Sequence, residues 1–316
     1  MFTLKILQVL DPSHESWVQG GVFKDLKNSS KVFHKKPVYL GSPFKTQSVF
    51  HWAWSVLRII FSRKILFSSL TPLENYSRVF SLIGYYQQKT LWFTHNEQIL
   101  NKRQLKAINR CGAVLVHSSK AKMELQEFYK GKIIVMLAAI EFTRFSSPSI
   151  SGEKIVWVGT YSRRKNPKLF LNLVRKNPHL QFRILGKNWD KKFVDALLFQ
   201  LKNLEYFEIE GAINSAQFNG CDIYLCTSEI EGAPMPLLES IAAGLNPISS
   251  DVGFVRDIFE YFQISEKFIY TSEDEVVGLV NSLRLNSCQR IDHNRALIKN
   301  LSFENLGKLI QSSFDV

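Results

Sequence analysis

Short runs of apolar and β-branched residues alternate along the chain with longer segments whose apolar residues recur every three or four positions. In the first half, the short runs predict strands at 5–10, 65–67, 90–93, 113–116 and 132–136. The longer spacing predicts helices at 96–110 and 120–129. Because parallel neighbouring strands need long crossover connections, this alternation indicates parallel sheets with crossover helices.

Residues 145–153, FSSPSISGE, interrupt the alternation, and their Ser, Pro and Gly content predicts a linker. The pattern then resumes with strands at 154–158, 181–185, 206–209, 223–226, 247–249 and 267–270 and helices at 167–175, 191–202, 236–243 and 273–283. We therefore expect an α/β protein with two Rossmann-like parallel-sheet domains, 1–145 and 146–300. Residues 301–316 are expected to form a helix that packs back on the first domain. Two such domains form a cleft, where folds of this kind bind ligands at the carboxyl ends of strands.

The segment EGAPMPLLE, residues 231–239, follows one of these strands and opens a helix. Pro236 suits the first helical turn, where its missing N–H costs little. A helix start of this kind stabilises a phosphate through free backbone N–H groups and the helix dipole. We expect those donors to be the amides of Leu237, Leu238 and Glu239, all in the first turn.

Two carboxylates, Glu231 and Glu239, stand at the two ends of this segment. Carboxylates accept hydrogen bonds from paired sugar hydroxyls, and Gly232 lets the backbone approach a ligand closely. The alternative is that Glu239 only balances the helix dipole and that Glu231 is a solvated loop residue.

A second segment of the same kind is WVGTYSRRKNP, residues 157–167. It also follows a strand and opens a helix, with Asn166 as a suitable N-cap and Pro167 as a suitable first residue. Arg163, Arg164 and Lys165 directly precede that helix, and cations beside helix amides form a site for a diphosphate. The alternative is a solvated basic turn.

Together the two segments resemble the donor-binding half of glycosyltransferase family 4, the retaining enzymes of the GT-B fold. In that family a Gly-Arg-x-x-x-x-Lys-Gly loop and a Glu-x7-Glu motif hold the nucleotide-sugar. Here Gly159-Thr160 and Lys165-Asn166 take the places of the loop, and Glu231 and Glu239 those of the second motif. The run CDIYLCTSEIEGAPMPLLESIAAGLNPISSDVGFVRDIF is similar to the family's core motif almost end to end. The resemblance implies a GT-B fold with an acceptor-side first domain and a nucleotide-sugar-binding second domain.

The resemblance also implies roles for the matching residues. Lys165 would contact the diphosphate, Glu231 would orient the donor sugar, and Glu239 would hold the ribose hydroxyls. Thr160 departs from the family's frequent Arg, and Arg163 or Arg164 is the candidate to replace its charge. The implied catalytic residues are His95, Glu231 and Lys165. The implied donor-binding residues are Gly20, Gly21, Gly159, Thr160, Arg164, Lys165, Gly232, Ala233, Met235, Leu237, Leu238 and Glu239.

The first half of the chain resembles the family at fewer positions. His95 ends the strand of KTLWFTHN, as the family's sugar-contacting His does; a structural or solvated His is the alternative. Gly20-Gly21 follows the first strand, like the family's glycine loop near the donor phosphates, and a plain turn is equally consistent. Residues 133–145, which end in Arg-Phe, resemble the interdomain stretch, whose usual Asn, Gly and Asp are replaced by Ala138, Ala139 and Glu141.

The chain carries 40 basic and 28 acidic residues among 316, a net charge of +12. This excess indicates a phosphate-rich partner: a nucleic acid, an anionic membrane surface or a phosphorylated substrate. The basic residues form no compact block, and no nucleic-acid-binding motif occurs, so we expect no nucleic-acid partner.

The most apolar stretch is VFHWAWSVLRIIFSRKILFSSL, residues 49–70. Arg58, Arg63 and Lys64 interrupt it, so it does not have the composition of a membrane span. Trp and Arg side chains together suit the lipid headgroup region, which predicts peripheral attachment to an anionic membrane surface. The alternative is a Trp-rich helix buried against its own sheet.

Four scattered cysteines and the lack of a signal-peptide pattern at the start favour a cytoplasmic protein with reduced thiols. Peripheral attachment would place it at the inner face of a membrane. No cluster has metal-ligand spacing, and the family needs no essential metal, so we expect no metal and no cofactor.

The expected function is that of a retaining, metal-independent hexosyltransferase. It would use a nucleotide diphosphate sugar and a glycan or lipid-linked acceptor in cell-surface polysaccharide or glycolipid synthesis. The substitutions Thr160, Ala138 and Ala139 leave one alternative, a catalytically silent GT-B protein that binds nucleotide-sugar or a partner.

Overall fold

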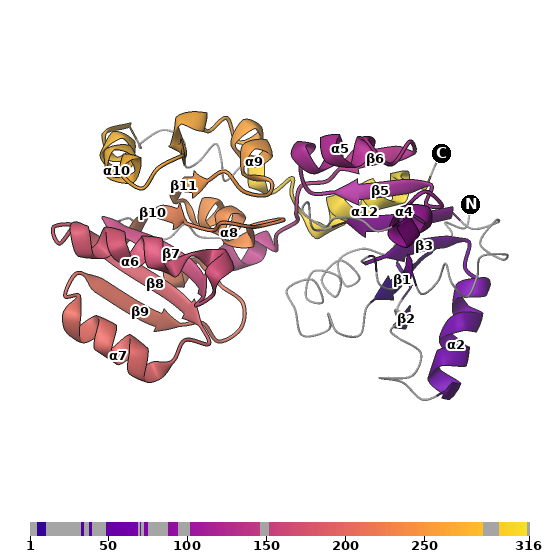
Figure 1. Ribbon diagram of the computed structural model, residues 1–316, viewed down its shortest axis with the longest axis horizontal. Helices are drawn as coiled ribbons and strands as arrows, with labels where there is room; N and C mark the ends of the chain where they lie inside the picture. The colour runs from indigo at the N-terminus through magenta and orange to yellow at the C-terminus, as the bar shows by residue number, and fades with distance from the viewer. Residues whose placement is uncertain are drawn as a thin grey trace. The chain divides into compact units, whose positions relative to one another are not determined.

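The computed structural model describes residues 5–10, 33–34, 38–39, 49–68, 70, 73–74, 88–93, 102–145, 152–286 and 297–314. The chain divides into two compact units. Unit 1 contains Met1–Ala139 together with Phe303–Val316, and unit 2 contains Ile140–Ser302 (Figure 1). The chain therefore leaves unit 1, forms all of unit 2 and then returns to unit 1.

The described strands of unit 1 form a parallel sheet in the order β2-β1-β3-β4-β5-β6. Their bounds are β1 Ile6–Leu10, β2 Val38–Tyr39, β3 Lys64–Phe67, β4 Gln88–Phe93, β5 Ala113–Val116 and β6 Lys132–Val135. The described helices are α2 Val49–Ile60, α4 Lys102–Ile108, α5 Ser119–Gln126 and α12 Phe303–Ser312.

The two faces of this sheet are covered by different helices because successive side chains of a strand point to opposite faces. Ile65 and Phe67 of β3 lie in one core with buried residues of α2, α4 and α5. Leu66, between them, lies in a second core with Leu306 and Ile310 of α12. The last described helix is therefore part of the hydrophobic core of unit 1.

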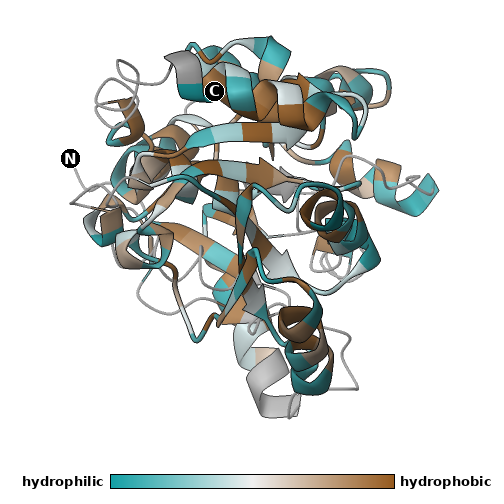
Figure 2. Cartoon of the chain, turned by 90° about the vertical axis from the view of Figure 1, so that its left-hand side faces the viewer, coloured by the Kyte–Doolittle hydropathy of each residue, from teal (hydrophilic) through white to brown (hydrophobic). Residues whose placement is uncertain are grey.

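The described strands of unit 2 form a parallel sheet in the order β12-β11-β10-β7-β8-β9. Their bounds are β7 Lys154–Thr160, β8 Gln181–Lys187, β9 Leu204–Glu208, β10 Cys221–Cys226, β11 Asn246–Ser250 and β12 Ile269–Tyr270. The described α-helices of unit 2 are α6 Pro167–Lys176, α7 Lys191–Gln200, α8 Met235–Ala243, α9 Val255–Tyr261 and α10 Glu275–Asn286, of which α6 to α9 connect strands and α10 follows the last one. Hydrophobic residues follow the strands, and hydrophilic residues lie mainly on the outer sides of the helices (Figure 2).

The strand order of unit 2 reverses between β7 and β10. From β7 the chain adds β8 and β9 on one side, then returns to place β10 against the other side of β7 and continues outward to β11 and β12. Such a reversal is the topological switch point of a doubly wound sheet, where the loops at the strands' carboxyl ends diverge and leave room for a ligand.

The α/β class, the parallel sheets and most predicted elements are confirmed, with ends that differ by a few residues. The predicted strand at 267–270 is shorter, because η6 (Glu266–Phe268) forms a 3-10 turn closed by the Phe268 amide on the Ser265 carbonyl at 3.1 Å. Two elements, β2 and α9, were not predicted from the sequence. The start of the predicted helix at 96–110 lies outside the described residues, and its described part is α4. Among the described helices, none is both long and apolar enough to cross a bilayer.

The packing of α12 predicts a clear contrast between two neighbouring residues. Ile310 is fully buried in the second core of unit 1, whereas Leu309 is 36% exposed. We expect Ile310→Ala to lower the free energy of unfolding by about 2–5 kcal/mol, because it leaves a cavity. Leu309→Ala is the matched control and should change it by about 0.5 kcal/mol or less. Urea unfolding followed by circular dichroism measures both, and equal effects would contradict the packing of α12 on this sheet.

Candidate functional site

The two segments singled out in the sequence lie next to each other at the switch point of unit 2. The first follows β7 and the second follows β10, and these strands pair directly, with Tyr224 opposite Val156. Because the strands are parallel, both loops leave the sheet at its carboxyl edge.

The loop after β7 has the predicted helix start. A short 3-10 turn, η4 (Arg163–Lys165), leads to Asn166, whose side chain caps α6 by accepting from the Leu169 amide at 3.3 Å. Asn166 adopts the left-handed conformation, with φ at 46°, which Asn tolerates better than most residues. This turn holds Lys165 in a buried position, so the solvated-turn alternative is wrong for Lys165.

Thr227, directly after β10, joins the two loops. Its buried hydroxyl donates to the carbonyl of Lys165 at 2.9 Å and lies 3.0 Å from the carbonyl of Asn166. The same oxygen accepts a hydrogen bond from the indole N–H of Trp157 in β7 at 2.8 Å. A second link runs from the Glu229 amide to the Arg164 carbonyl at 2.9 Å. The position of the basic loop is thus fixed by the strand beside it.

Glu231 forms the centre of a charged cluster. Its carboxylate lies 2.7 Å from the Lys165 ammonium and 2.5 Å from the Arg164 guanidinium. The Ser228 hydroxyl donates to the same carboxylate at 3.0 Å. The Glu231 side chain is only 6% exposed, so the solvated-loop alternative is wrong for this residue. Arg163, in contrast, is 96% exposed, and its guanidinium lies 3.9 Å from the Glu229 carboxylate. Of the two arginines, Arg164 therefore supplies charge to the cluster.

The start of α8 differs from the prediction in two respects. The helix begins at Met235, so Glu239 lies in its second turn and not in the first. The Leu237 amide was expected to be free for a phosphate. It instead donates to the Pro234 carbonyl at 2.9 Å. Both differences arise because the helix closes its first turn on Pro234. The amides that precede this bond, those of Gly232, Ala233 and Met235, are the remaining candidates, whereas Leu237 and Leu238 point their side chains into the core.

The Glu239 carboxylate is buried beneath this cluster and faces Arg144, whose guanidinium lies 3.7 Å away. Arg144 belongs to η3 (Phe142–Phe145) and is held by donating to the Ile213 carbonyl at 3.0 Å. Burial raises the pKa of Glu239 to about 7, and the positive charges of Arg144 and Lys165 offset part of that rise. The Arg-Phe pair was noted in the sequence, but this contact was not predicted because it joins residues that are distant in the chain.

Gly253 was also missed, and it holds the Glu231–Gly232 backbone in place. Its φ of 54° is in the left-handed region, which favours glycine. A Cβ at Gly253 would lie 2.4 Å from the Gly232 carbonyl oxygen and 2.8 Å from that of Glu231. The only signal in the sequence was a glycine shortly after a strand, within the family-like motif.

The remaining predicted site residues lie around these groups or outside the described residues. Gly159 is in van der Waals range of the Lys165 side chain, since a Cβ there would meet its Cγ and Cδ at 3.3 Å. The Thr160 hydroxyl is 3.4 Å from that of Ser162. His95, Gly20 and Gly21 lie outside the residues that the structure describes.

Aromatic rings support the backbone of the first loop from the β8 side. The indole N–H of Trp189 donates to the Gly159 carbonyl at 3.0 Å. Tyr161 packs edge-to-face on both Trp189 and Phe193, with ring centroids 5.0 Å apart in each pair. These rings were not assigned from the sequence. They pack on the end of β7 and on Tyr161, in the loop that leads to the cations.

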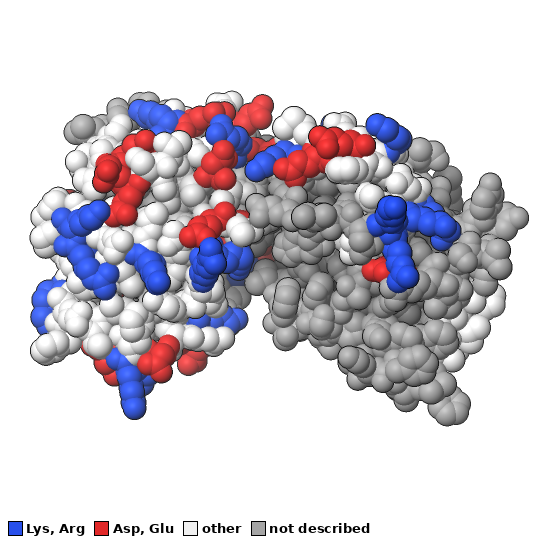
Figure 3. All heavy atoms as spheres, in the orientation of Figure 1, with Lys and Arg blue, Asp and Glu red and all other residues white. Residues whose placement is uncertain are grey.

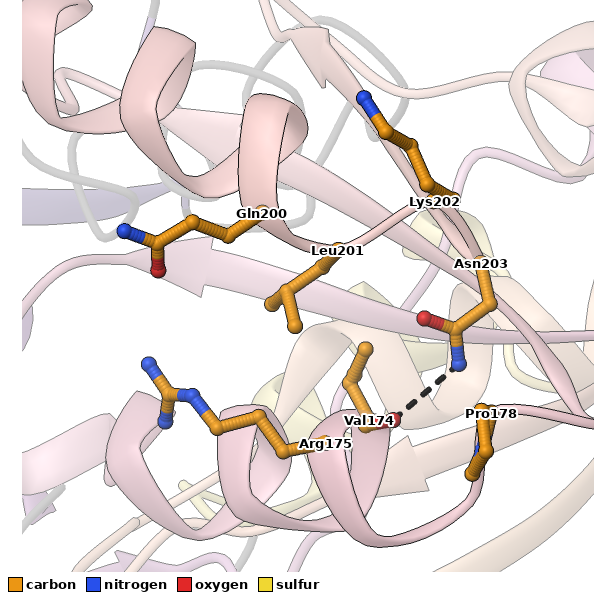
Figure 4. Close-up of a pocket in the computed structure, with 7 residues that line it drawn as sticks. All are labelled: Val174, Arg175, Pro178, Gln200, Leu201, Lys202 and Asn203. Atoms are coloured by element: carbon orange, nitrogen blue, oxygen red, sulfur yellow. Dashed lines mark hydrogen bonds between the residues drawn. The ribbon is translucent and has the colours of Figure 1, made fainter.

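A pocket of about 280 Å³ lies at the opposite edge of the sheet. It is formed by the end of α6 and the turn between α7 and β9, near the amino ends of the strands (Figure 4). Asn203 closes one side by donating to the carbonyls of Val174, Asn177 and Leu180 at 3.0–3.1 Å. These bonds satisfy the end of α6, so the pocket is explained by the packing of the fold and does not belong to the charged cluster.

The family model described as glycosyl transferases group 1 matches residues 139–300, just over half of the chain. The chain belongs to this family. The match contains Arg144, Lys165, Glu231, Glu239 and Gly253, the residues that form or support the cluster.

Two curated relatives of this chain come from Escherichia coli. They are the O-antigen biosynthesis glycosyltransferase WbnH and the probable O-antigen biosynthesis glycosyltransferase WbiN. Each is 27% identical to this chain over 124 residues, which cover 39% of the chain. The match spans only 35% of the relatives' own length.

Solved structures resemble the chain over nearly its whole length. The apo form of the lipopolysaccharide outer core galactosyltransferase WaaB has a TM-score of 0.73 at 17% identity and covers 98% of both chains. Anabaena HepE in complex with UDP has a TM-score of 0.74 at 9% identity and covers 98% of this chain and 99% of its own. Sucrose-phosphate synthase from Thermosynechococcus elongatus gives a TM-score of 0.69 at 10% identity over 98% of both chains. These likenesses show the GT-B fold.

The buried carboxyl of Glu239 makes the stability of the protein depend on pH. An acid whose pKa rises from 4.5 to about 7 on folding stabilises the folded state fully below pH 4.5 and loses that contribution as pH rises through 7. The change should be on the order of 3 kcal/mol. Glu239→Gln mimics the protonated form, so its stability relative to the natural protein should rise by this amount between pH 5 and pH 8. Urea unfolding at both pH values measures the difference, with Glu260→Gln at an exposed position of α9 as the control. Parallel pH profiles of the Glu239→Gln variant and the natural protein would contradict the assignment.

The backbone contact of Gly253 predicts opposite effects of the same substitution at two glycines. Gly253→Ala should lower the free energy of unfolding by at least about 1–2 kcal/mol, the strain of a left-handed alanine. The contact with Gly232 should also displace the loop and speed amide hydrogen exchange at residues 229–235. Gly278→Ala in α10 meets no atom within 4 Å and should stabilise by about 0.5–1 kcal/mol. Unchanged exchange in the Gly253→Ala variant would show that the loop does not depend on this contact.

Proposed function

We propose that this protein transfers a hexosyl group, with retention of configuration, from a nucleoside diphosphate sugar to an acceptor hydroxyl. The acceptor belongs to a growing cell-surface polysaccharide or glycolipid. One observation carries the proposal: at the switch point of unit 2, Lys165 and Arg164 both form ion pairs with Glu231, in the loop that leads to the start of α8.

The cations suit a diphosphate. Lys165 is a buried ammonium at the carboxyl edge of the sheet, and Arg164 is half exposed beside it. An incoming diphosphate would lie over these cations and the amides of Gly232, Ala233 and Met235, where a helix dipole favours negative charge. Because the charge of the leaving phosphate grows in the transition state, prearranged cations lower the barrier more than they strengthen binding of the ground state.

The two glutamates suit two different parts of the donor. Glu231 lies at the cations and would orient the hydroxyls of the transferred sugar near the reacting carbon. Glu239 is buried in the second turn of α8 and would accept hydrogen bonds from the ribose hydroxyls. Those bonds favour the ionised carboxylate, so nucleotide binding should lower the pKa of Glu239 and release protons near pH 7.

The proposed transfer step needs no protein base, because the leaving phosphate takes the acceptor proton. The acceptor oxygen forms a bond to the anomeric carbon on the face from which the bond to the phosphate oxygen breaks. A non-bridging oxygen of the leaving phosphate takes the acceptor proton, and the products are the glycoside and the nucleoside diphosphate. His95 would contact the donor sugar, and Gly20 and Gly21 the phosphates, as the family resemblance implies. The cations take the role that a metal plays in other transferases.

The relatives support the choice of donor and acceptor. HepE was solved in complex with UDP and with UDP-glucose, and the pneumococcal O-GlcNAc transferase GtfA with UDP and GlcNAc. Uridine donors are therefore the first to test. WbnH is named for O-antigen biosynthesis and WaaB for the lipopolysaccharide outer core, which supports a cell-surface glycan as the acceptor.

A panel of donors tests the function. The protein is heated with UDP, UDP-glucose, UDP-galactose or GDP-mannose in the presence of EDTA. A ligand at 100 times its dissociation constant should stabilise the folded state by about 2.7 kcal/mol. The same mixtures are incubated, and slow release of free sugar with retained anomeric configuration is followed by NMR. Binding without hydrolysis or transfer would favour the catalytically silent alternative, and no binding by any nucleotide would refute the proposal.

A pair of lysine variants assigns the binding to the cluster. Lys165→Met should weaken nucleoside diphosphate binding by about 10- to 150-fold, since hydrogen bonds to charged groups contribute about 1.5–3 kcal/mol. Lys202→Met, at the opposite edge of the sheet, keeps the same change in net charge and should leave affinity unchanged. Calorimetric titration separates the two. Equal losses in both variants would indicate a general effect of charge and contradict a phosphate site at Lys165.

A further inference from the structure

The apolar residues of α2 are divided between two faces. Ile59 is fully buried in the core that α2 shares with the sheet of unit 1, and Val56 and Ile60 pack against that core. Trp54 and Leu57 are 64% and 44% exposed, and Phe61, just after the helix, is 82% exposed. The alternative of a helix buried against its sheet therefore holds for one face of α2 only.

The exposed residues form a continuous stripe. Trp54, Leu57 and Phe61 are spaced three and four apart, and residues at this spacing lie one above another on a helix. Single exposed apolar residues are ordinary, but a contiguous patch that includes two large aromatic rings indicates a surface that meets another apolar phase.

The segment of sequence that contains this stripe is strongly basic. Residues 26–73 contain eight Lys and Arg and no Asp or Glu, so this short segment accounts for two-thirds of the net charge of +12. Arg63 follows the stripe directly and is exposed. On the same side of the sheet, α4 and the turn after it add the exposed Lys102, Lys106 and Arg110, and basic side chains gather over α4 in Figure 3.

We propose that the α2–α4 surface, defined by Trp54, Leu57, Phe61, Arg63, Lys102 and Lys106, binds an anionic lipid bilayer. The aromatic rings enter the boundary between headgroups and acyl chains, and the cations meet lipid phosphates. A second copy of the chain is a poor occupant, because it would place one cationic surface against another. A nucleic acid would leave the apolar stripe without a partner.

Vesicle binding tests this proposal without any donor or acceptor, so its result is independent of the proposed function. The protein is sedimented with vesicles of phosphatidylcholine alone or with about one-third phosphatidylglycerol, at low and high salt. We expect strong binding only to the anionic vesicles at low salt, since each cation near such a surface contributes about 1 kcal/mol and salt screens it. Equal binding to both vesicle types, or none, would overturn the proposal.

Two variants and two matched controls locate the surface. Trp54→Ser with Phe61→Ser should weaken vesicle binding by about ten-fold or more, because burial of a large apolar side chain contributes about 1.5–3 kcal/mol. Replacing the cations Arg63, Lys102 and Lys106 with Gln should weaken vesicle binding by about five-fold for each cation. The controls are Phe199→Ser and Gln at Lys191, Lys192 and Lys202, all in or beside α7 of unit 2. Both should bind vesicles like the natural protein.

The remaining outcomes decide the proposal as well. The substituted side chains are exposed or lie outside the buried core, so thermal unfolding should stay close to that of the natural protein. Equal losses in the variants and the controls would overturn the assignment to α2 and α4. A concentration-dependent dimer that the Trp54→Ser and Phe61→Ser changes abolish would overturn the lipid surface in favour of a protein interface.

Discussion

The hydroxyl of Thr227 is the interaction on which the geometry of the cluster depends. It is buried directly after β10, accepts from Trp157 in β7 and donates to the loop that carries Lys165. This contact is possible only because β7 and β10 are paired where the strand order reverses. The loop that carries the cations and the loop that carries Glu231 are therefore placed relative to each other by the sheet, before any ligand is present.

In the cluster, ion pairs and a hydrogen bond offset the cost of burying charged side chains. Lys165 and Glu231 are both largely withdrawn from water, which is unfavourable for either alone, and their mutual contact with Arg164 and Ser228 offsets that cost. Glu239 is less well compensated, because Arg144 is 3.7 Å from its carboxylate, and its pKa rises accordingly. The two glutamates of one motif thus differ in their partners, because Glu231 contacts two cations closely and Glu239 faces one at a longer distance. A phosphate that enters the cluster will compete with Glu231 for the same cations.

Local signals sufficed to predict the alternation of strands and helices, the parallel sheets and the two loops. The cap at Asn166 is one such signal, because it depends only on the three residues that follow. The contacts of Arg144 with Glu239 and of Gly253 with Gly232 join distant parts of the chain, and no local pattern contains them. The first turn of α8 was misplaced by one residue because Pro234 closes it, and a proline two residues later gave the stronger local signal. The two faces of α2 read alike in the sequence, since both carry large apolar residues, and only packing separates them.

The return of α12 to unit 1 determines the order in which the two units can be completed during synthesis. The ribosome delivers the strands of unit 1 first, but the helix that covers one face of their sheet emerges only after the whole of unit 2. Unit 2 is continuous in the chain and can fold as soon as it leaves the exit tunnel, whereas Leu66 and its neighbours in the second core lack their contacts with α12 until that helix emerges. The core of unit 1 is therefore completed last, although its strands are made first.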